Sequence, residues 1–310
     1  MSVARQVTRR LTRRSLILLY HRITAETNDP FSLCVSPKRF EEQLEILHRC
    51  SDVVTLDELD SHAKRERVAI TFDDGYLDNL EQALPVVERL GLPITVFVTS
   101  ATLGSAKGFW WDRLAGLLQG QSEVDVTVAL PAGPLRIRVS GQAAVRQALD
   151  ALQRRLRPLS VDVIERALDE LEGQLEQVPL QSSSALPLTR DELLQLAASP
   201  LVTIGAHTTD HRLLGARPAE EQLDTIARSK ADLETLLGRE VRHFAYPFGD
   251  SASFDHHSVD AVRVAGFRTA CTTERGNVTR WSNPLSLPRR MVFDWGGETF
   301  AERIAPWSAR

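Results

Sequence analysis

The chain has 310 residues, of which 43% are hydrophobic and 25% charged, the composition of an ordinary globular protein. Lysine plus arginine (37) and aspartate plus glutamate (41) nearly balance, which gives a net charge of −4. Because no excess of positive charge is present, we expect no binding to nucleic acid. Cys34, Cys50 and Cys271 are too few for a disulfide framework and lack metal-type spacing, which indicates a reducing compartment.

The N-terminus is rich in arginine, with six arginines and no acidic residue in the first 22 positions. The apolar run Leu16–Tyr20 is shorter than the roughly 7–15 residues of a signal-peptide core. The chain also lacks the apolar stretch of about 20 residues that a transmembrane helix needs. We therefore expect a cytoplasmic protein with no transmembrane segment. Residues 1–14 are interpreted as a solvated basic tail, with peripheral contact to anionic membrane lipid as the alternative.

Short β-branched runs alternate with amphipathic stretches along the chain, which predicts alternating strands and helices. In chain order, the expected strands are Ser15–Tyr20, Val68–Phe72, Ile94–Thr99, Leu201–Ala206, His243–Tyr246, Thr269–Thr272 and Leu285–Val292. The expected helices are Pro37–Arg49, Leu77–Leu90, Ala219–Leu237 and Ser258–Ala265. This alternation indicates the α/β class, with parallel strands and helices packed outside them. Because the glycine-rich nucleotide fingerprint and the P-loop pattern are absent, we favour a (β/α) barrel over an open doubly wound sheet.

The alternation is interrupted over about residues 104–187. This stretch begins with Phe109-Trp110-Trp111 and continues with a predicted hairpin, Val124–Leu130 and Leu135–Val139. Two predicted helices follow, Gln142–Leu156 and Val161–Gln177, and then a polar linker that starts near Gln181. Since the stretch is too long for a structureless loop, it predicts an inserted α+β subdomain within a barrel domain of residues 15–310.

Two adjacent carboxylates, Asp73 and Asp74, follow the predicted strand Val68–Phe72. Reactive groups of (β/α) barrels lie at the C-terminal ends of the strands, which is where this pair falls. Strand alternation puts Thr71 and Asp73 on one face, and Gly75 allows a turn that aims Asp74 at the same centre. Adjacent like charges need compensation, which a divalent metal would supply. A capping Asp-Asp-Gly turn is the structural alternative.

His207 and His211 follow the predicted strand Leu201–Ala206. Their spacing of four predicts that one helical turn brings both rings to the same side. Two imidazoles and one carboxylate make a three-ligand catalytic metal site with open positions. A lone histidine is more often structural, but the pair together with the two aspartates favours a metal site.

A third stretch, His243–Asp250, ends another predicted strand with Pro247 and Gly249. Such a turn can present a backbone N–H to a developing oxyanion. By itself the pattern is interpreted as an ordinary turn at the end of a strand.

The three stretches resemble the motifs of the polysaccharide deacetylase family, carbohydrate esterase family 4, whose domain is of the NodB-homology type. Its first motif, Thr-Phe-Asp-Asp-Gly, matches residues 71–75, and its second, His-[Ser/Thr]-x-x-His, matches residues 207–211. The third motif usually reads Arg-x-Pro-[Tyr/Phe], whereas this chain has Ala245-Tyr246-Pro247-Phe248 and lacks the arginine. The opening Leu18–Arg22 resembles the branch that begins with a Tyr-His strand. The resemblance covers about residues 16–103 and 188–292 and implies a distorted (β/α) barrel of about seven strands.

The resemblance also implies roles for individual residues. Asp74, His207 and His211 would bind one divalent metal ion, with zinc expected and cobalt, nickel or iron as alternatives. Asp73 would be the general base, and the backbone N–H of Phe248 would help to hold the oxyanion.

Two roles of the family have no matching residue in the usual motif. The late Leu-x-His motif has no histidine in Leu285–Val292, so His21 of the Tyr-His strand is the candidate that protonates the leaving amine. A structural histidine bonded to backbone is the alternative for His21. In place of the missing arginine, Arg289 or Arg290 could orient Asp73, although surface arginine is the more common interpretation.

Four side chains are candidates for contact with the substrate. They are Tyr246, Trp110, Trp111 and Arg289. The two tryptophans would either stack on sugar faces or pack the insert against the barrel.

Together these features predict a metal-dependent hydrolase that removes an N-acyl group, most simply N-acetyl, from an amino sugar. The expected substrate is a glycan or a glycan precursor that is nucleotide-linked, lipid-linked or soluble. One alternative is a metal-dependent amidase or deformylase acting on a small amide. An alternative of another class is a non-catalytic glycan-binding relic. The chain retains both aspartates and both histidines of the motifs, Asp73, Asp74, His207 and His211, and this favours the enzyme.

Overall fold

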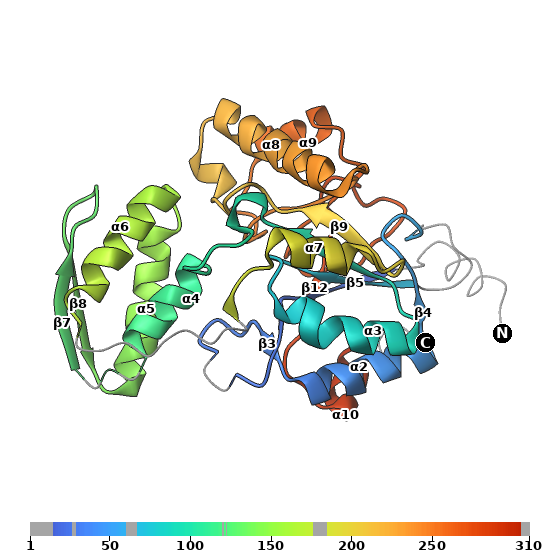
Figure 1. The fold of residues 1–310 in the computed structure, drawn as a ribbon, viewed down its shortest axis with the longest axis horizontal. Helices are drawn as coiled ribbons and strands as arrows, with labels where there is room; N and C mark the ends of the chain where they lie inside the picture. Colours follow the sequence, from blue (N-terminus) through green and yellow to red (C-terminus); the bar gives the residue numbers. More distant parts are fainter. Residues whose placement is uncertain are drawn as a thin grey trace.

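The computed structural model describes residues 15–26, 29–59, 67–119, 121, 123–175 and 185–304. The predicted basic tail, most of the predicted polar linker and the end of the predicted helix Val161–Gln177 lie outside these residues. The main body is a curled β-sheet with helices packed on its outside, and a second group of elements extends from one end of it (Figure 1).

The sheet contains seven parallel strands in one continuous order. They are β11 (Thr269–Cys271), β10 (His243–Ala245), β9 (Val202–Ala206), β6 (Ile94–Val98), β5 (Arg67–Phe72), β1 (Leu16–Tyr20) and β12 (Arg290–Met291). A short strand, β4 (Asp52–Val53), also pairs with β5 in parallel. This architecture confirms the predicted α/β class and the distorted barrel of about seven strands.

The segment after β11 crosses the open side of the curled sheet. Leu287 bridges to Cys271 of β11, and three residues later β12 pairs with β1. The prediction of one strand over Leu285–Val292 was therefore wrong for most of its length. The segment leaves one edge of the sheet and joins the other, so it cannot pair with a single neighbour throughout.

Helices cover the outside of the sheet in two groups (Figure 1). One group is α2 (Pro37–Cys50), α3 (Leu84–Leu90) and α10 (Gly297–Ile304), and the other is α7 (Arg190–Ala197), α8 (Ala219–Leu237) and α9 (His256–Val264). The first part of the predicted helix Leu77–Leu90 is a π-helical turn, Asn79–Ala83, that leads into α3. Neither α7 nor α10 was predicted from the sequence. The remaining short elements are β2 (Arg22–Ile23), β3 (Cys34–Val35) and the 3-10 turns Ser100–Thr102 and Leu214–Ala216.

Both faces of the central strands are buried, as expected for a parallel sheet. Leu16, Leu18 and Tyr20 of β1 point into the core under the helices, whereas Ile17 points into the barrel interior. The interior is narrow, because a Cβ atom on Gly205 would lie 2.5 Å from the ring of Phe97. The barrel is thus filled with apolar side chains below its C-terminal end.

The elements between β6 and α7 form a core of their own. They are α4 (Trp110–Leu118), the antiparallel pair β7 (Glu123–Val128) and β8 (Leu135–Ser140), α5 (Gln142–Leu156) and α6 (Val161–Glu172). Figure 1 shows them in green at one end of the molecule. Their apolar side chains pack on one another and on Tyr76 of the barrel. The division into a barrel domain and an inserted subdomain with the predicted bounds stays a prediction.

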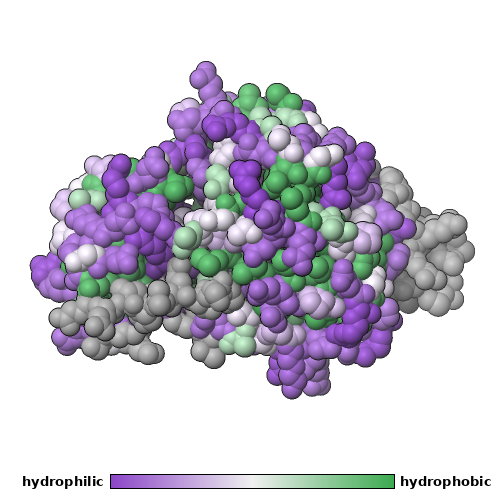
Figure 2. Space-filling model, in the orientation of Figure 1, coloured by the Kyte–Doolittle hydropathy of each residue, from purple (hydrophilic) through white to green (hydrophobic). Residues whose placement is uncertain are grey.

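The surface mixes hydrophilic and apolar residues, with hydrophilic ones over most of the face in Figure 2. Large apolar side chains are exposed singly, and the most exposed are Val264 (72%) and Trp281 (77%). None of the helices in the described part of the chain has the length and apolarity that a membrane crossing requires.

Candidate active site

Five candidate residues follow the carboxyl ends of parallel strands. Asp73 and Asp74 follow β5, His21 follows β1, His207 follows β9 and Phe248 comes shortly after β10. Because these strands belong to one parallel sheet, their carboxyl ends meet at the same end of the barrel. The candidate residues therefore gather where (β/α) barrels carry their active sites.

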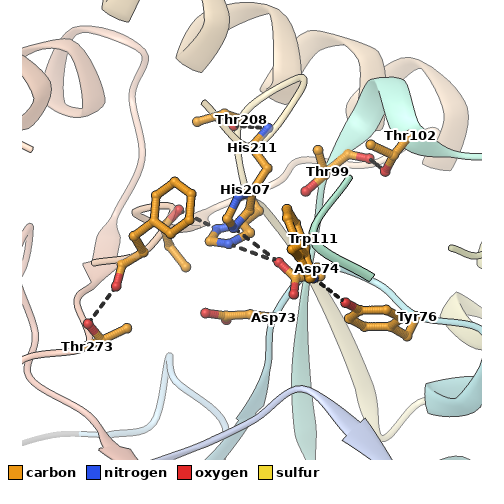
Figure 3. Close-up of polar contacts among 12 residues, drawn as sticks. Asp73, Asp74, Tyr76, Thr99, Thr102, Trp111, His207, Thr208, His211 and Thr273 are labelled. Carbon is orange, nitrogen blue, oxygen red and sulfur yellow. Dashed lines mark hydrogen bonds and ion pairs between the residues drawn. The ribbon is translucent and has the colours of Figure 1, made fainter. Parts of the chain in front are cut away.

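Asp74, His207 and His211 form a compact buried cluster (Figure 3). Asp74 Oδ1 lies 3.5 Å from His207 Nε2 and 3.3 Å from His211 Nε2. One possible ligand atom from each residue lies within 4.8 Å of the other two. Asp74 Oδ1 is buried and accepts no hydrogen bond of regular geometry from the described residues. Asp74 Oδ1 and the two imidazole Nε2 atoms therefore lie close together without a regular hydrogen bond between the carboxylate oxygen and either ring.

A tight turn after β5 directs the Asp74 carboxylate toward β9. Asp74 has a φ of 74° and Gly75 a φ of 84°. A Cβ atom on Gly75 would lie 3.2 Å from the side chain of Val98, so both the φ angle and the space favour glycine. The Asp74 carbonyl accepts the Thr99 N–H at 3.3 Å, which ties the turn to the end of β6.

The prediction that a helical turn joins His207 and His211 was wrong, although their rings do lie together. Thr208 and His211 have φ angles of 63° and 55°, outside the helical region. The His211 N–H donates to Thr208 Oγ1 at 3.0 Å, so the threonine hydroxyl closes a turn in place of helical hydrogen bonds. The two ring centroids are 4.9 Å apart.

The electrostatics of the cluster suit a divalent cation. His207 Nδ1 lies 2.7 Å from the Ala245 carbonyl, which can only accept, so Nδ1 carries a proton and Nε2 faces Asp74. Burial lowers the pKa of His211 to about 3, which leaves its ring neutral. Burial alone would raise the pKa of Asp74, but its contacts with the His207 and His211 rings hold it at about 2, so the carboxylate is anionic. An anionic oxygen and imidazole nitrogens are donors that zinc and related metals bind.

Asp73 is held from inside the barrel by Arg289. The guanidinium Nη1 and Nη2 donate to the two Asp73 oxygens at 2.6 Å each. Arg289 also donates to the Thr272 carbonyl at 2.8 Å and to Thr71 Oγ1 at 3.2 Å. Burial would raise the pKa of Asp73, but the Arg289 charge and hydrogen bonds together with His207 lower it. Arg289 is 0% exposed, which contradicts substrate contact and supports its alternative role, the orientation of Asp73.

His21 lies directly after β1 and is half-buried as a whole, with its Nδ1 atom buried. Its Nδ1 has no hydrogen-bond partner among the described residues, and its backbone carbonyl accepts from Asn79 Nδ2 at 2.9 Å. Burial lowers the pKa of His21 more than the nearby carboxylates Asp74 and Asp73 raise it. The ring is therefore mainly neutral at pH 7, and its role as the acid stays a prediction.

Phe248 lies next to the metal-type cluster in a left-handed backbone conformation, with a φ of 61°. Its ring packs against the His211 ring at a centroid distance of 4.6 Å. Thr273 Oγ1 donates to the Phe248 carbonyl at 2.7 Å (Figure 3). Within the described part of the chain, the Phe248 N–H donates no backbone hydrogen bond. The amide is thus beside the cluster and has no backbone acceptor.

The other three substrate-contact candidates are buried. Tyr246 is 0% exposed, donates its hydroxyl to the Leu285 carbonyl at 2.8 Å and stacks on Phe254 at 4.2 Å. Trp110 and Trp111 are 6% and 4% exposed and belong to the core of the insert. These positions contradict direct stacking on a sugar and support the packing alternative for both tryptophans.

Trp111 instead forms one wall of the cluster, and two partners that sequence reasoning missed hold it in place. Its ring lies 4.5 Å from the His211 ring. Its Nε1 donates to the Tyr76 hydroxyl at 2.8 Å (Figure 3). That hydroxyl in turn donates to Asp112 at 2.8 Å. Burial raises the pKa of Asp112 to about 7. The one acidic residue in the apolar run from Phe109 to Leu118 was the signal available in the sequence.

Comparison with known proteins identifies the family of the chain. The family model for polysaccharide deacetylase matches residues 60–270. A relative from Bacillus subtilis (strain 168), named "Putative polysaccharide deacetylase YxkH", is 35% identical over 286 residues. The alignment covers 89% of this chain and 70% of the relative.

Solved structures share the fold over nearly the whole chain. The Streptococcus pyogenes deacetylase PplD, solved in complex with acetate, superposes with a TM-score of 0.60 at 16% identity, covering 93% of this chain and 97% of that one. IcaB from Ammonifex degensii has a TM-score of 0.61 at 19% identity, with 96% and 98% covered. Identities this low show the shared fold alone, whereas the match to the family model and the 35% identical relative show the family. The chain belongs to the polysaccharide deacetylase family.

Proposed function

We propose that this protein is a metal-dependent hydrolase that removes the N-acetyl group from an amino sugar of a glycan or glycan precursor. One observation carries the proposal. Asp74 shares a buried cluster with two imidazoles, while the adjacent Asp73 is kept out of that cluster by Arg289. The histidines beside Asp74 suit it to bind a metal ion, whereas the arginine bound to Asp73 leaves that carboxylate to act as a base. Membership of the polysaccharide deacetylase family supports the deacetylation of a glycan.

The metal would be held by Asp74 Oδ1 and by Nε2 of His207 and His211. Zinc is the expected ion, with cobalt, nickel or iron as alternatives, because this donor set accepts all of them. When bound, a divalent cation lowers the pKa of a water molecule to roughly 7 and polarises the amide carbonyl.

Asp73 would act as the general base that takes a proton from the attacking water. Arg289 keeps its carboxylate ionised and fixes both of its oxygens, so the form that accepts a proton is the one present. A positioned base of this kind typically contributes about 10²–10⁴-fold to the rate.

The Phe248 N–H and His21 would complete the reaction. Water adds to the carbonyl carbon, and the Phe248 N–H donates to the oxyanion that develops there. The carbon–nitrogen bond then breaks as His21, in its protonated form, delivers a proton to the leaving nitrogen. The proton that Asp73 took from the water replaces the one that His21 gives up, so the products are acetate and a free amine.

The test is the release of acetate by metal-loaded full-length protein from acetylated amino sugars that are free, nucleotide-linked or lipid-linked. Asp73→Asn should lower turnover by about 10²–10⁴-fold while keeping the bound metal, because Asp73 is not a ligand. His207→Ala should lose the metal. Asp52→Asn is the control, because Asp52 is a surface carboxylate that pairs with Arg67. Release of formate would indicate a deformylase, and a metal-free inert protein would indicate a glycan-binding relic.

A further inference from the structure

The end of α5 in the insert contacts the loop that carries Phe248. Arg157, the residue after α5, places its guanidinium carbon 3.9 Å from the centroid of the Phe248 ring. The same group donates through Nη2 to Asp250 Oδ2 at 3.0 Å and to Ser253 Oγ at 2.6 Å. One side chain of the insert therefore binds both ends of the loop from Phe248 to Ser253.

This loop needs restraint, because Phe248 has a φ of 61° without being a glycine. Bulky residues keep such a conformation only where their surroundings fix it. Thr273 holds the Phe248 carbonyl at 2.7 Å, and Asp250 accepts from Ser253 Oγ at 2.6 Å. Neither contact fixes the Phe248 ring. The ring contacts the guanidinium of Arg157 and the ring of His211, 4.6 Å away.

A second contact ties the same part of the insert to the barrel. Arg217, just after the turn Leu214–Ala216, donates through Nη2 to the Pro158 carbonyl at 3.2 Å. The Gly215 N–H donates to the Ser253 carbonyl at 2.9 Å. The turn that follows α5 is thus docked on the Phe248–Ser253 loop and on the segment beside it.

We propose that Arg157 is a positioning residue, which holds the Phe248 backbone N–H in the orientation that the oxyanion requires. This inference rests on the proposed function. It assigns the insert a part in the reaction, although the insert supplies neither a metal ligand nor the base. Arg157 acts through Phe248 and does not need to touch the substrate.

The expected effect is a loss of kcat with little change in KM. Removing a donor of an oxyanion site outright typically costs about 10²–10³-fold in kcat. Arg157→Ala leaves the donor in place but loosens it, so we expect a loss of roughly 10–100-fold. The metal content should not change, because Arg157 is not a ligand. Arg157→Lys keeps a charge for Asp250 but loses the planar contact with the ring, so it should restore only part of the rate.

The experiment measures acetate release, metal content and amide hydrogen exchange over residues 248–253 in the full-length protein. Arg155→Ala is the matched control, since Arg155 is an exposed arginine on the same helix. We expect Arg157→Ala to speed exchange in the loop and to lower kcat, and Arg155→Ala to do neither. If Arg157→Ala does not fold, Arg157→Lys and Asp250→Asn apply the same test with smaller changes.

Two results would overturn the inference. One is that Arg157→Ala matches Arg155→Ala in both kcat and exchange. The other is that it loses the metal, because the residue would then support the cluster and not the amide. Wild-type protein that releases no acetate from any substrate would instead refute the proposed function, and the exchange data would still report whether Arg157 restrains the loop.

Discussion

Arg289→Met tests whether the buried pair with Asp73 is needed for stability as well as for orientation. The substitution keeps a long side chain but removes the arginine that binds Asp73 through two hydrogen bonds of 2.6 Å. Both side chains are almost fully buried, with 0% and 3% exposed. Breaking a buried pair by removing one partner costs about 3–5 kcal/mol. Because Asp73 can relieve the strain by taking up a proton, the lower end of that range is expected.

The assay is urea unfolding at pH 7.5 with no added metal. Arg290→Met is the control, since Arg290 is the next residue in the chain and is not bound to Asp73. The double variant Asp73→Asn/Arg289→Met should recover most of the lost free energy of unfolding, because a neutral amide needs no counter-charge. It should remain inactive. Equal stability of Arg289→Met and Arg290→Met, or no recovery in the double variant, would refute the reasoning.

Three further substitutions test the burial described above. Tyr246→Phe removes the hydroxyl bonded to the Leu285 carbonyl. It should lower the free energy of unfolding by about 1 kcal/mol and leave KM unchanged. A raised KM would instead support the predicted contact between Tyr246 and the substrate. The pKa of Asp112, about 7, exceeds its unfolded value of about 4, so its contribution to stability falls as pH rises between these values. The free energy of unfolding should therefore change less between pH 5 and 8 in Asp112→Asn than in the wild type, by up to ~3 kcal/mol. Gly205→Ala would put a Cβ atom 2.5 Å from the Phe97 ring and should cost about 1–3 kcal/mol in thermal unfolding, whereas a neutral effect would contradict the tight interior.

The strands and the two metal-type motifs could be predicted because the signal for each is local. The runs before Asp73 and His207 are apolar and β-branched, and each motif spans five consecutive residues at the carboxyl end of a strand. Parallel strands bring their carboxyl ends to one edge, so two local signals predict one site. The α8 helix was also predicted with the bounds that the structure shows, because Gly238 ends it in a left-handed conformation with a φ of 64°.

What could not be predicted depends on contacts between distant parts of the chain. The spacing of His207 and His211 fits a helix, and only the bond to Thr208 Oγ1 reveals the turn that forms instead. Aromatic side chains such as Trp111 and Tyr246 suit a sugar or a core equally well, and only their burial decides between the two. Arg157 gives no signal at all, because it is one of several arginines at the end of an amphipathic helix.

The closing segment of the sheet has a consequence for how the protein acquires its activity. Arg289 lies 216 residues after Asp73 and outside the residues 60–270 that the family model matches. A nascent chain on the ribosome would therefore expose both aspartates long before the counter-ion of Asp73 has been synthesised. Asp73 becomes oriented only when the segment that carries Arg289 arrives and β12 joins the edge of the sheet. Under the proposed function, a product that ends before Arg289 would therefore be inactive.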